Sequence, residues 1–158
     1  MARATRKRPG PEAGDPSGAH AGELEGAVGF WLRLAQQQDL KAFNRLFADN
    51  GITQPLYAML LAVAAKPGLR QADIGERLHM RQPNLVEPID TLIGRGLIVR
   101  RPDPNDGRAQ AIDLTPAGAA LLERLRAAHK QLISSYRDRL GADRYAQLVD
   151  LLRAFVGR

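Results

Sequence analysis

The sequence predicts a mainly α-helical fold in which one β-hairpin interrupts a series of helices. Apolar residues recur with a period of about 3.6 between residues 23 and 47 and again after residue 116, as in long amphipathic helices. On either side of residues 102–108, PDPNDGR, the period changes to two, which predicts two short strands joined by a loop. The chain has 158 residues, enough for one domain with its own core.

Composition excludes several classes of protein. Hydrophobic residues make up 44% and charged residues 25%, the balance of a globular protein. The absence of cysteine excludes a disulfide scaffold, a thiolate metal site and a cysteine nucleophile. No apolar run approaches about 18 residues, the length of a membrane span. No apolar segment follows the basic N-terminal residues, so we expect no secretory signal and a cytoplasmic location.

The charge balance favours a polyanionic partner. Lys and Arg number 23 against 17 Asp and Glu, which gives a net charge of +6 and an isoelectric point near 10.3. Such a balance is typical of nucleic-acid-binding proteins, and most of the basic residues are arginines, which suit phosphate and guanine contacts. An arginine-rich composition also arises in GC-rich genomes, so charge alone does not identify the partner.

The chain divides into a tail and one domain. Residues 1–20 are basic and rich in proline and glycine, which predicts a disordered tail. The tail is either simply solvated or reaches DNA phosphates as a flexible arm. Residues 21–158 form the domain, with a central unit at about 52–115 and flanking long helices at about 22–48 and 116–157.

The first helix runs from Glu23 to about Phe47, with a bend expected near Gln36–Asp39. Its apolar face is longer than so small a domain needs, which predicts a helix-to-helix partner surface as well as core. Thr53 and Pro55 suit the N-cap and first turn of a second helix.

Two short helices follow, near residues 71–78 and from about Gln82 to Gly94, joined by a tight turn at His79–Met80. Strands at 97–101 and 109–114 form the hairpin around the loop. Helices joined by a tight turn and followed by a hairpin predict a winged helix-turn-helix.

The last part of the chain is helical. Thr115–Pro116 is an N-cap followed by a proline at the first helical position. The helix that they open is long and breaks at Gly141, after which a final helix carries Tyr145, Leu148, Leu152 and Phe155 at helical spacing. One protomer cannot cover this stripe and that of the first helix, which predicts an isologous dimer.

Two stretches resemble the MarR family of bacterial transcriptional regulators. LHMRQPNLVEPIDTLIGRGLIVRR, from Leu78 to Arg101, resembles the family's recognition helix and the R-G-L that leads into its wing. DPNDGR, at 103–108, and LTPAG, at 114–118, resemble its D-x-R wing and the following L-T-x-x-G. The likeness covers about residues 22–157. It implies a homodimer built from the terminal helices, two winged helices on a pseudo-palindromic operator of double-stranded DNA, and repression relieved by a small ligand.

The start of the recognition helix carries the residues suited to base contacts. A helix fits the major groove with its N-terminal residues toward the base edges. Gln82 and Asn84 would bond adenine, Arg81 guanine or phosphate, and Glu87 the amino group of cytosine. Solvated positions are the alternative for Arg81 and Glu87. The candidate DNA-binding residues are Arg70, Gln71, Arg81, Gln82, Pro83, Asn84, Glu87, Arg100, Arg101, Asp106 and Arg108.

At the wing, Arg108 resembles the family arginine that enters the minor groove, where A·T tracts concentrate negative potential. Asp106 would orient it by a salt bridge, and an ordinary surface pair is the alternative. Arg70, Gln71, Arg100 and Arg101 are candidate phosphate contacts.

Two residues of the recognition helix depart from the family pattern. Glu87 stands where many relatives are basic, and it opposes phosphates unless it contacts a base. Pro88 removes the amide that would bond the Asn84 carbonyl, which predicts a bent axis. These departures leave open a second function, a helical protein-interaction adaptor that no longer binds DNA.

The resemblance places a ligand site between the first, second and fifth helices and points to aromatic carboxylates or their coenzyme A thioesters. The residues suited to line it are Trp31, Phe43, Phe47, Tyr57, His129 and Tyr136. All lie on helices, most of them on apolar faces, so packing in the core is the alternative for each.

An enzyme finds no support in the sequence. There is no glycine-rich phosphate loop and no G-x-S-x-G, and Ser134, Ser135 and His129 share one helix in the wrong relation for a triad. The three histidines are too far apart in the sequence for a metal site. We therefore expect no catalytic residue, metal or cofactor.

Overall fold

The structure, a computed structural model, describes residues 22–103 and 106–157, without the side chains of residues 107 and 108. The predicted tail at residues 1–20 lies outside this part. The chain divides within one long helix into two compact units, residues 1–38 and 39–158. Among the described residues, no helix is both long and apolar enough to cross a membrane.

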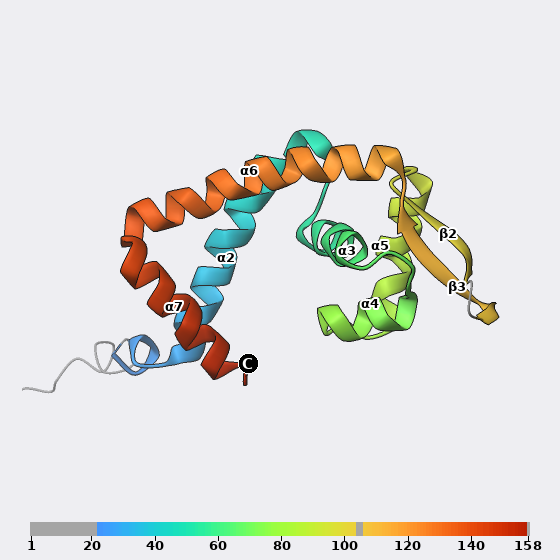
Figure 1. The fold of residues 1–158 in the computed structure, drawn as a ribbon. Coiled ribbons are helices and arrows are strands. Elements are labelled where there is room, and N and C mark those ends of the chain that lie inside the picture. Colours follow the sequence, from blue (N-terminus) through green and yellow to red (C-terminus); the bar gives the residue numbers. More distant parts are fainter. Residues whose placement is uncertain (1–21, 104–105, 158) are drawn as a thin grey trace, which may run out of the picture. The chain divides into compact units, whose positions relative to one another are not determined.

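The architecture is mainly helical, as predicted, with the hairpin between helices (Figure 1). In chain order the elements are α2 (Val28–Phe47), the 3₁₀ turn η1 (Ala48–Asn50), α3 (Gln54–Ala65), β1 (Leu69–Arg70), α4 (Gln71–Leu78), α5 (Pro83–Gly94), β2 (Ile98–Asp103), β3 (Asp106–Leu114), α6 (Pro116–Leu140) and α7 (Ala142–Phe155).

The first helix differs from its prediction. A separate helical turn covers residues 22–25, and the non-helical residues Gly26 and Ala27 separate it from α2. Glycine disfavours a helix interior by about 1 kcal/mol relative to alanine, and Gly22, Gly26 and Gly29 crowd this stretch. From residue 28 the helix continues through 36–39 without a break in its helical backbone.

The sheet has a third strand that the sequence did not predict. The strand order is β1-β3-β2, all antiparallel, with Leu69 opposite Ile112 and Ile98 opposite Leu114. The hairpin strands also extend into the predicted loop, to Asp103 on one side and from Asp106 on the other. Pro102 fits because β2 is an edge strand, where a missing amide is tolerated.

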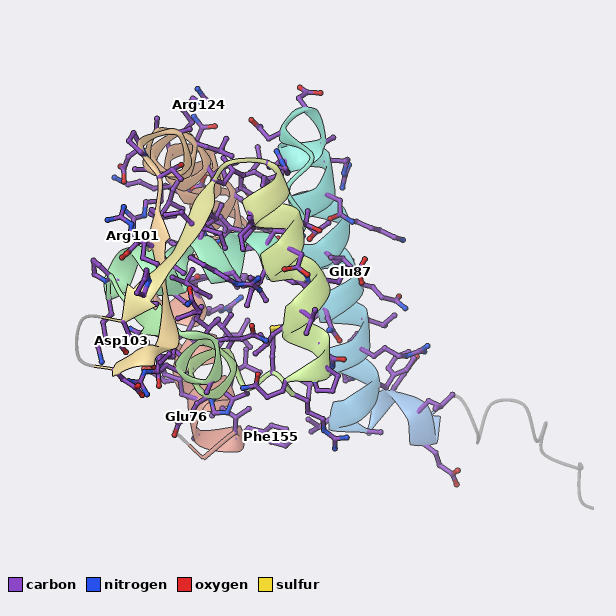
Figure 2. All side chains as sticks on the ribbon, turned by 90° about the vertical axis from the view of Figure 1, so that its right-hand side faces the viewer. Glu76, Glu87, Arg101, Asp103, Arg124 and Phe155 are labelled. Atoms are coloured by element: carbon purple, nitrogen blue, oxygen red, sulfur yellow. The ribbon has the colours of Figure 1, made fainter. Side chains whose placement is uncertain are left out.

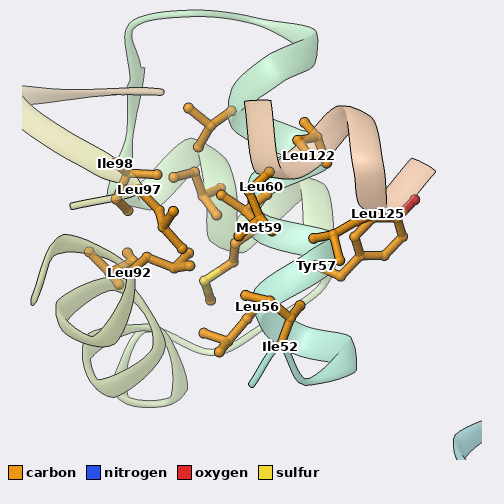
Figure 3. Packing of buried hydrophobic residues seen from close by; sticks show 14 of the residues in the cluster. Ile52, Leu56, Tyr57, Met59, Leu60, Leu92, Leu97, Ile98, Leu122 and Leu125 are labelled. Atoms are coloured by element: carbon orange, nitrogen blue, oxygen red, sulfur yellow. The ribbon is translucent and has the colours of Figure 1, made fainter. Parts of the chain in front are cut away.

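The core packs α3 against α5, the sheet and the first half of α6 (Figure 3). Its side chains with no more than 2% exposure include Phe43, Phe47, Met59, Leu60, Ile74, Leu85, Ile89, Leu92, Ile98, Ile112, Leu122 and Leu125. Arg95, just after α5, donates to the backbone carbonyls of Asn50 (2.6 Å) and Gly51 (2.7 Å) and so ties the chain before α3 to this core.

The two predicted N-caps behave differently. Thr115 Oγ1 accepts from the Gly118 amide at 3.0 Å and also lies 2.6 Å from the Gly96 carbonyl oxygen, as a donor. Thr53 occupies the N-cap of α3 with an extended backbone but forms no side-chain cap hydrogen bond. The predicted break between the last two helices is confirmed at Gly141, which has a φ of 82°.

The last helix, α7, buries none of its residues. Its large exposed apolar side chains, with the adjoining residue 156, are Leu148, Leu151, Leu152, Phe155 and Val156, and Leu151 and Phe155 are 62% and 64% exposed. A stripe of this kind is a surface suited to a partner helix.

Candidate functional site

The helix-turn-helix is held together by a close approach at Gly75. A Cβ at this position would lie 2.8 Å from Leu85 Cδ1 and 3.0 Å from the Met80 carbonyl oxygen, so only glycine lets α4 and α5 meet this closely. His79 adopts a left-handed conformation, with φ of 53°, in the predicted turn, and the Met80 amide donates to the Gly75 carbonyl at 2.8 Å. The turn therefore fixes how α5 leaves the core.

The first turn of α5 is exposed, whereas the opposite face of the helix is buried. Leu85, Ile89 and Leu92 have no exposed surface. The predicted contact residues Arg81, Gln82, Pro83, Asn84 and Glu87 are all exposed, and Figure 2 shows Glu87 on this helix. The structure thus brings together five predicted residues at one helix end.

Gln71, at the start of α4, lies beside this group. Its Nε2 is 3.5 Å from Gln82 Oε1, so two of the predicted residues from different helices meet there. Pro88 lies inside α5, which stays helical from Pro83 to Gly94. The bend predicted at Pro88 stays a prediction.

The sequence interpretation missed one residue of this surface, Val86. Its side chain is 47% exposed and follows Gln82 by four residues, which places both on one side of the helix. The helical spacing from Gln82 was the available signal. An exposed apolar side chain on this face is suited to the methyl group of thymine.

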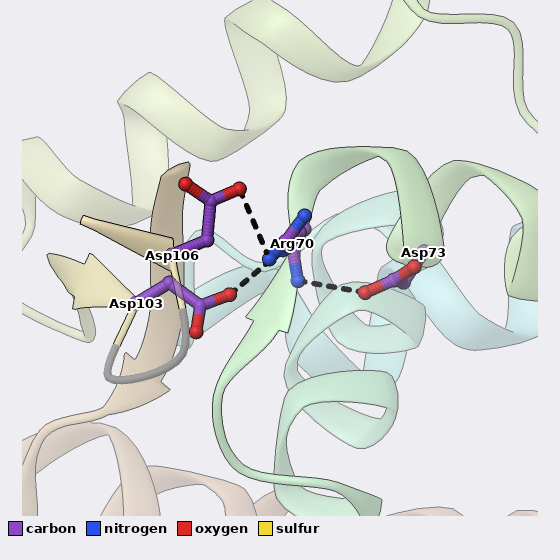
Figure 4. Close-up of polar contacts among 4 residues, drawn as sticks. All are labelled: Arg70, Asp73, Asp103 and Asp106. Carbon is purple, nitrogen blue, oxygen red and sulfur yellow. Dashed lines mark hydrogen bonds and ion pairs between the residues drawn. The ribbon is translucent and has the colours of Figure 1, made fainter. Parts of the chain in front are cut away.

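Arg70 lies between the helix-turn-helix and the wing (Figure 4). Its Nε donates to Asp103 Oδ2 at 2.7 Å, and its Nη2 is 3.5 Å from Asp106 Oδ2. Its backbone amide donates to Asp73 Oδ2 at 3.0 Å, which caps α4. The hydrogen bond to Asp103 raises the pKa of Arg70 above its ordinary value. We call Arg70, Asp103 and Asp106 the wing clamp.

Of the two candidates on β3 of the wing, the structure describes the side chain of Asp106 but not that of Arg108. Asp106 pairs with Arg70, a contact that the sequence did not predict. The predicted pair between Asp106 and Arg108 lies outside the described residues, because Arg108 is described only as part of the β3 backbone. Gln110, two residues after Arg108 on β3, is exposed.

Arg100 and Arg101 are exposed and each faces a carboxylate of the same unit. Arg100 Nη2 lies 3.1 Å from Asp90 Oδ1 on α5, and Arg101 Nε lies 3.8 Å from Asp113 Oδ2 on β3. Figure 2 shows Arg101 and Asp103 along β2. Exposed pairs of this kind are weak, about 0–1 kcal/mol, so either arginine can exchange its carboxylate for a phosphate.

Four of the predicted ligand residues form one aromatic cluster. Phe43 and Phe47 from α2, Tyr57 from α3 and His129 from α6 lie with ring centroids 4.1 to 6.3 Å apart. The first three are buried, and burial raises the pKa of the Tyr57 hydroxyl against the opposing effect of Arg126. Phe43, Phe47 and Tyr57 belong to the hydrophobic core, and His129 is half-buried beside them.

A polar bridge crosses the same three helices. Asp39 on α2 accepts from Tyr136 Oη at 2.9 Å through Oδ1 and from Gln54 Nε2 at 2.9 Å through Oδ2. Burial and the hydrogen bond to Asp39 raise the pKa of Tyr136 from 10.0 to about 12. Trp31, the remaining candidate, belongs to the other unit, where it is 54% exposed and its Nε1 donates to the Glu25 carbonyl at 2.7 Å.

A separate cavity of about 540 Å³ opens between α3, the base of the wing and α6. Val63, Leu114 and Leu122 supply apolar lining, and charges of both signs come from Arg101, Asp113, Glu123 and Arg126. Its volume is within the range of small-molecule sites. The predicted ligand residues do not line it, so the cavity and the aromatic cluster are different places.

The chain is similar to known proteins in both sequence and structure. A model described as the MarR family matches residues 50–109. A putative transcriptional regulatory protein for the hcr operon of Thauera aromatica is 31% identical over 133 residues, which cover 84% of this chain and 80% of the relative.

Three solved structures, of two proteins, are similar over most of the chain. The transcriptional repressor CouR bound to a 23-mer DNA duplex is 33% identical with a TM-score of 0.81, over 87% of this chain and 96% of that one. CouR bound to p-coumaroyl-CoA is 30% identical with a TM-score of 0.80 over the same shares. The regulator PcaV from Streptomyces coelicolor, in complex with its natural ligand, is 32% identical with a TM-score of 0.77, over 84% and 94%.

Proposed function

Because the chain belongs to the MarR family of transcriptional regulators, we propose that it is a repressor that binds a pseudo-palindromic operator as a homodimer. A small aromatic acid or its coenzyme A thioester releases it. The observation that carries this proposal is the exposed first turn of α5, where Arg81, Gln82 and Asn84 stand free of the core on a helix whose other face is buried.

In this proposal α5 enters the major groove, where base edges are distinguishable. Gln82 and Asn84 bond adenine, and Arg81 contacts guanine or phosphate. Val86 packs against a thymine methyl group, and Glu87 accepts from cytosine N4. Pro83 brings the backbone of the first turn close to the bases.

The wing supplies the flanking contacts. Arg108 enters the minor groove, with Asp106 beside it. Arg100 and Arg101 leave their weak carboxylate pairs for phosphates, and Gln71, at the start of α4 beside Arg70, contacts the DNA backbone. Phosphate contacts position the protein, whereas contacts to base edges select the sequence.

The exposed stripe of α7 supports the homodimer. Leu148, Leu151, Leu152 and Phe155 need a partner, and a second copy offers the same stripe in an isologous contact. A dimer of this kind sets two recognition helices about 34 Å apart, one turn of DNA.

The effector is proposed on a different ground. CouR is solved with p-coumaroyl-CoA and PcaV with its natural ligand, and this chain has an aromatic cluster between α2, α3 and α6. Phe43, Phe47, Tyr57 and His129 are packed on one another, so a ligand enters only by displacing rings.

The test is selection of bound duplexes from a random-sequence pool, followed by fluorescence anisotropy with the selected duplex. We expect affinity to fall steeply between about 50 and 200 mM salt, because bound arginines release counterions. Aromatic acids and thioesters, p-coumaroyl-CoA among them, are then added to find the one that abolishes binding. A protein that selects no duplex would instead support the interaction adaptor.

A further inference from the structure

Arg70 connects the start of the helix-turn-helix to the far end of the wing. Its backbone belongs to β1 and to the N-terminus of α4, whereas its guanidinium pairs with Asp103 and Asp106. These two carboxylates close the described ends of β2 and β3. One side chain therefore links both wing strands to α4.

The far half of the wing depends on such a link. β1 pairs with β3 at Ile112 and Ala111. Beyond Ala111 the hairpin continues with β2 and β3 paired to each other, to the Asp103–Asp106 pair. A two-stranded hairpin is at best marginally stable by itself, so its orientation depends on contacts with its surroundings.

The backbone turns Asp103 toward this contact. The pairing register shifts between Pro102 and Asp103, and such irregularities redirect a side chain. Asp103 is 8% exposed, and it is the buried charged residue among the described part of the chain. Arg70 Nε lies 2.7 Å from this buried carboxylate, and breaking a buried ion pair is costly, so the geometry favours an Arg70 that stays with Asp103 over one that turns to a phosphate.

We propose that Arg70 is a positioning residue that holds the wing for the minor groove through Asp103 and Asp106, and that it does not itself neutralise a phosphate. This rests on the proposed DNA-binding function and assigns a mechanism to one residue of the same interface. Under this proposal, tight DNA binding requires the Asp103 carboxylate, although its negative charge lies near the DNA.

The two roles of Arg70 give opposite results for Asp103→Asn. If Arg70 contacts a phosphate, removing the nearby negative charge strengthens binding, since DNA is a polyanion. If the wing clamp positions the wing, the same change weakens binding roughly ten-fold, equivalent to about 1.4 kcal/mol.

The experiment measures binding to one duplex, selected by the wild-type protein from a random pool, at several salt concentrations. The variants are Arg70→Ala, Asp103→Asn and the double variant, with Glu76→Gln as the control, because Glu76 is an exposed carboxylate on α4. We expect both single variants to lose affinity, the double variant to lose no more than the worse single one, and the control to lose none. The slope of log affinity against log salt should be the same for Arg70→Ala and wild type.

Two results would overturn the proposal while leaving DNA binding intact. One is an Asp103→Asn variant that binds as well as or better than wild type. The other is a salt slope that falls by about 0.9 in Arg70→Ala, the value for one lost phosphate contact. The salt slope of Arg70→Ala covers the case in which Asp103→Asn does not fold, because it separates the two roles without that variant. A wild-type protein that selects no duplex refutes the proposed function itself.

Discussion

At the scale of single residues, Val86 is the position that most directly tests what the recognition helix contacts. Its side chain is 47% exposed on α5. In a selected duplex, replacing the contacted thymine by uracil removes only a methyl group. We expect a loss of several-fold in affinity for the wild-type protein, since a good base contact is worth about 1–3 kcal/mol and one methyl is at the low end. Anisotropy titrations with thymine and uracil duplexes measure it.

The matching variant is Val86→Ala, which should bind the two duplexes equally. Asn84→Ala is the control, because it should weaken binding without changing the ratio between thymine and uracil. Equal binding of both duplexes by the wild-type protein, with uracil placed at each thymine in turn, would show that Val86 contacts no methyl group.

Tyr136 predicts a pH dependence of stability. Its pKa is about 12 in the folded chain and 10.0 as the ordinary value. A pKa raised by folding stabilises the fold below the ordinary pKa, and this stabilisation is lost as pH rises through the folded value. Between pH 10 and 12 the free energy of unfolding should therefore fall, and in Tyr136→Phe it should fall less steeply. Denaturant unfolding at pH 8, 10 and 11 measures the difference.

A remaining decline is expected in Tyr136→Phe, because the pKa of Tyr57 is raised too. At neutral pH the variant should lose about 1.5 kcal/mol, the lower value for a hydrogen bond to a charged group. Parallel pH profiles for the wild type and the variant would contradict the bridge through Asp39.

Residue types and spacing predicted the exposed turn of α5, but they did not predict the ion pair between Arg70 and Asp106. Arg70 and Asp106 were each assigned to DNA, and the sequence held no sign that they meet, because they are brought together only when β1 joins the sheet. Phe43 and Tyr57 were predicted as alternatives, core or pocket, and in the folded chain they are buried.

At the scale of elements, helix periodicity and caps were sufficient for α3, α4, α5, α6 and α7. β1 has two residues, too few for any alternation, and its pairing with β3 comes from tertiary structure. The prolines and glycine at residues 102–108 led to the prediction of a loop where β2 and β3 in fact continue. A proline is tolerated there because β2 is an edge strand. The first helix was predicted to continue through Gly26, but the backbone is not helical at Gly26 and Ala27.

The two threonine caps give a matched pair for measuring a cap. Thr115→Ala should lower the free energy of unfolding by about 1 kcal/mol, the usual cost of a lost N-cap bond. Thr53→Ala removes the same atoms at a position without that bond, so its cost should be well below that of Thr115→Ala. Urea unfolding of both variants measures the difference, and equal losses would mean that Oγ1 of Thr115 contributes nothing as a cap.

At the scale of the whole molecule, the exposed stripe of α7 predicts the oligomeric state. Phe155→Asp places a charge on the stripe and should convert the dimer into a monomer with unchanged helix content. The same protein should bind the selected duplex at least ten-fold more weakly, because half-sites bound separately lose the advantage of a linked pair. Analytical ultracentrifugation and circular dichroism measure the two properties.

Ala154→Asp is the control, since it introduces the same carboxylate on the neighbouring residue, away from the stripe. It should remain dimeric. A Phe155→Asp variant that stays dimeric would show that the subunits meet on another surface, and a monomeric wild-type protein would contradict the homodimer altogether.

The start of α6 follows the wing directly, because Thr115 is the single residue between β3 and α6. A Cβ on Gly118 would collide with the Leu97 carbonyl oxygen, and the Thr115 hydroxyl donates to the Gly96 carbonyl just before β2. The first turn of α6, a helix of 25 residues, is thus packed against the two residues that precede β2. In the proposed complex, a rotation of α6 about its axis would carry the hairpin with it, so ligand binding along α6 would change the position of the hairpin on DNA without a hinge.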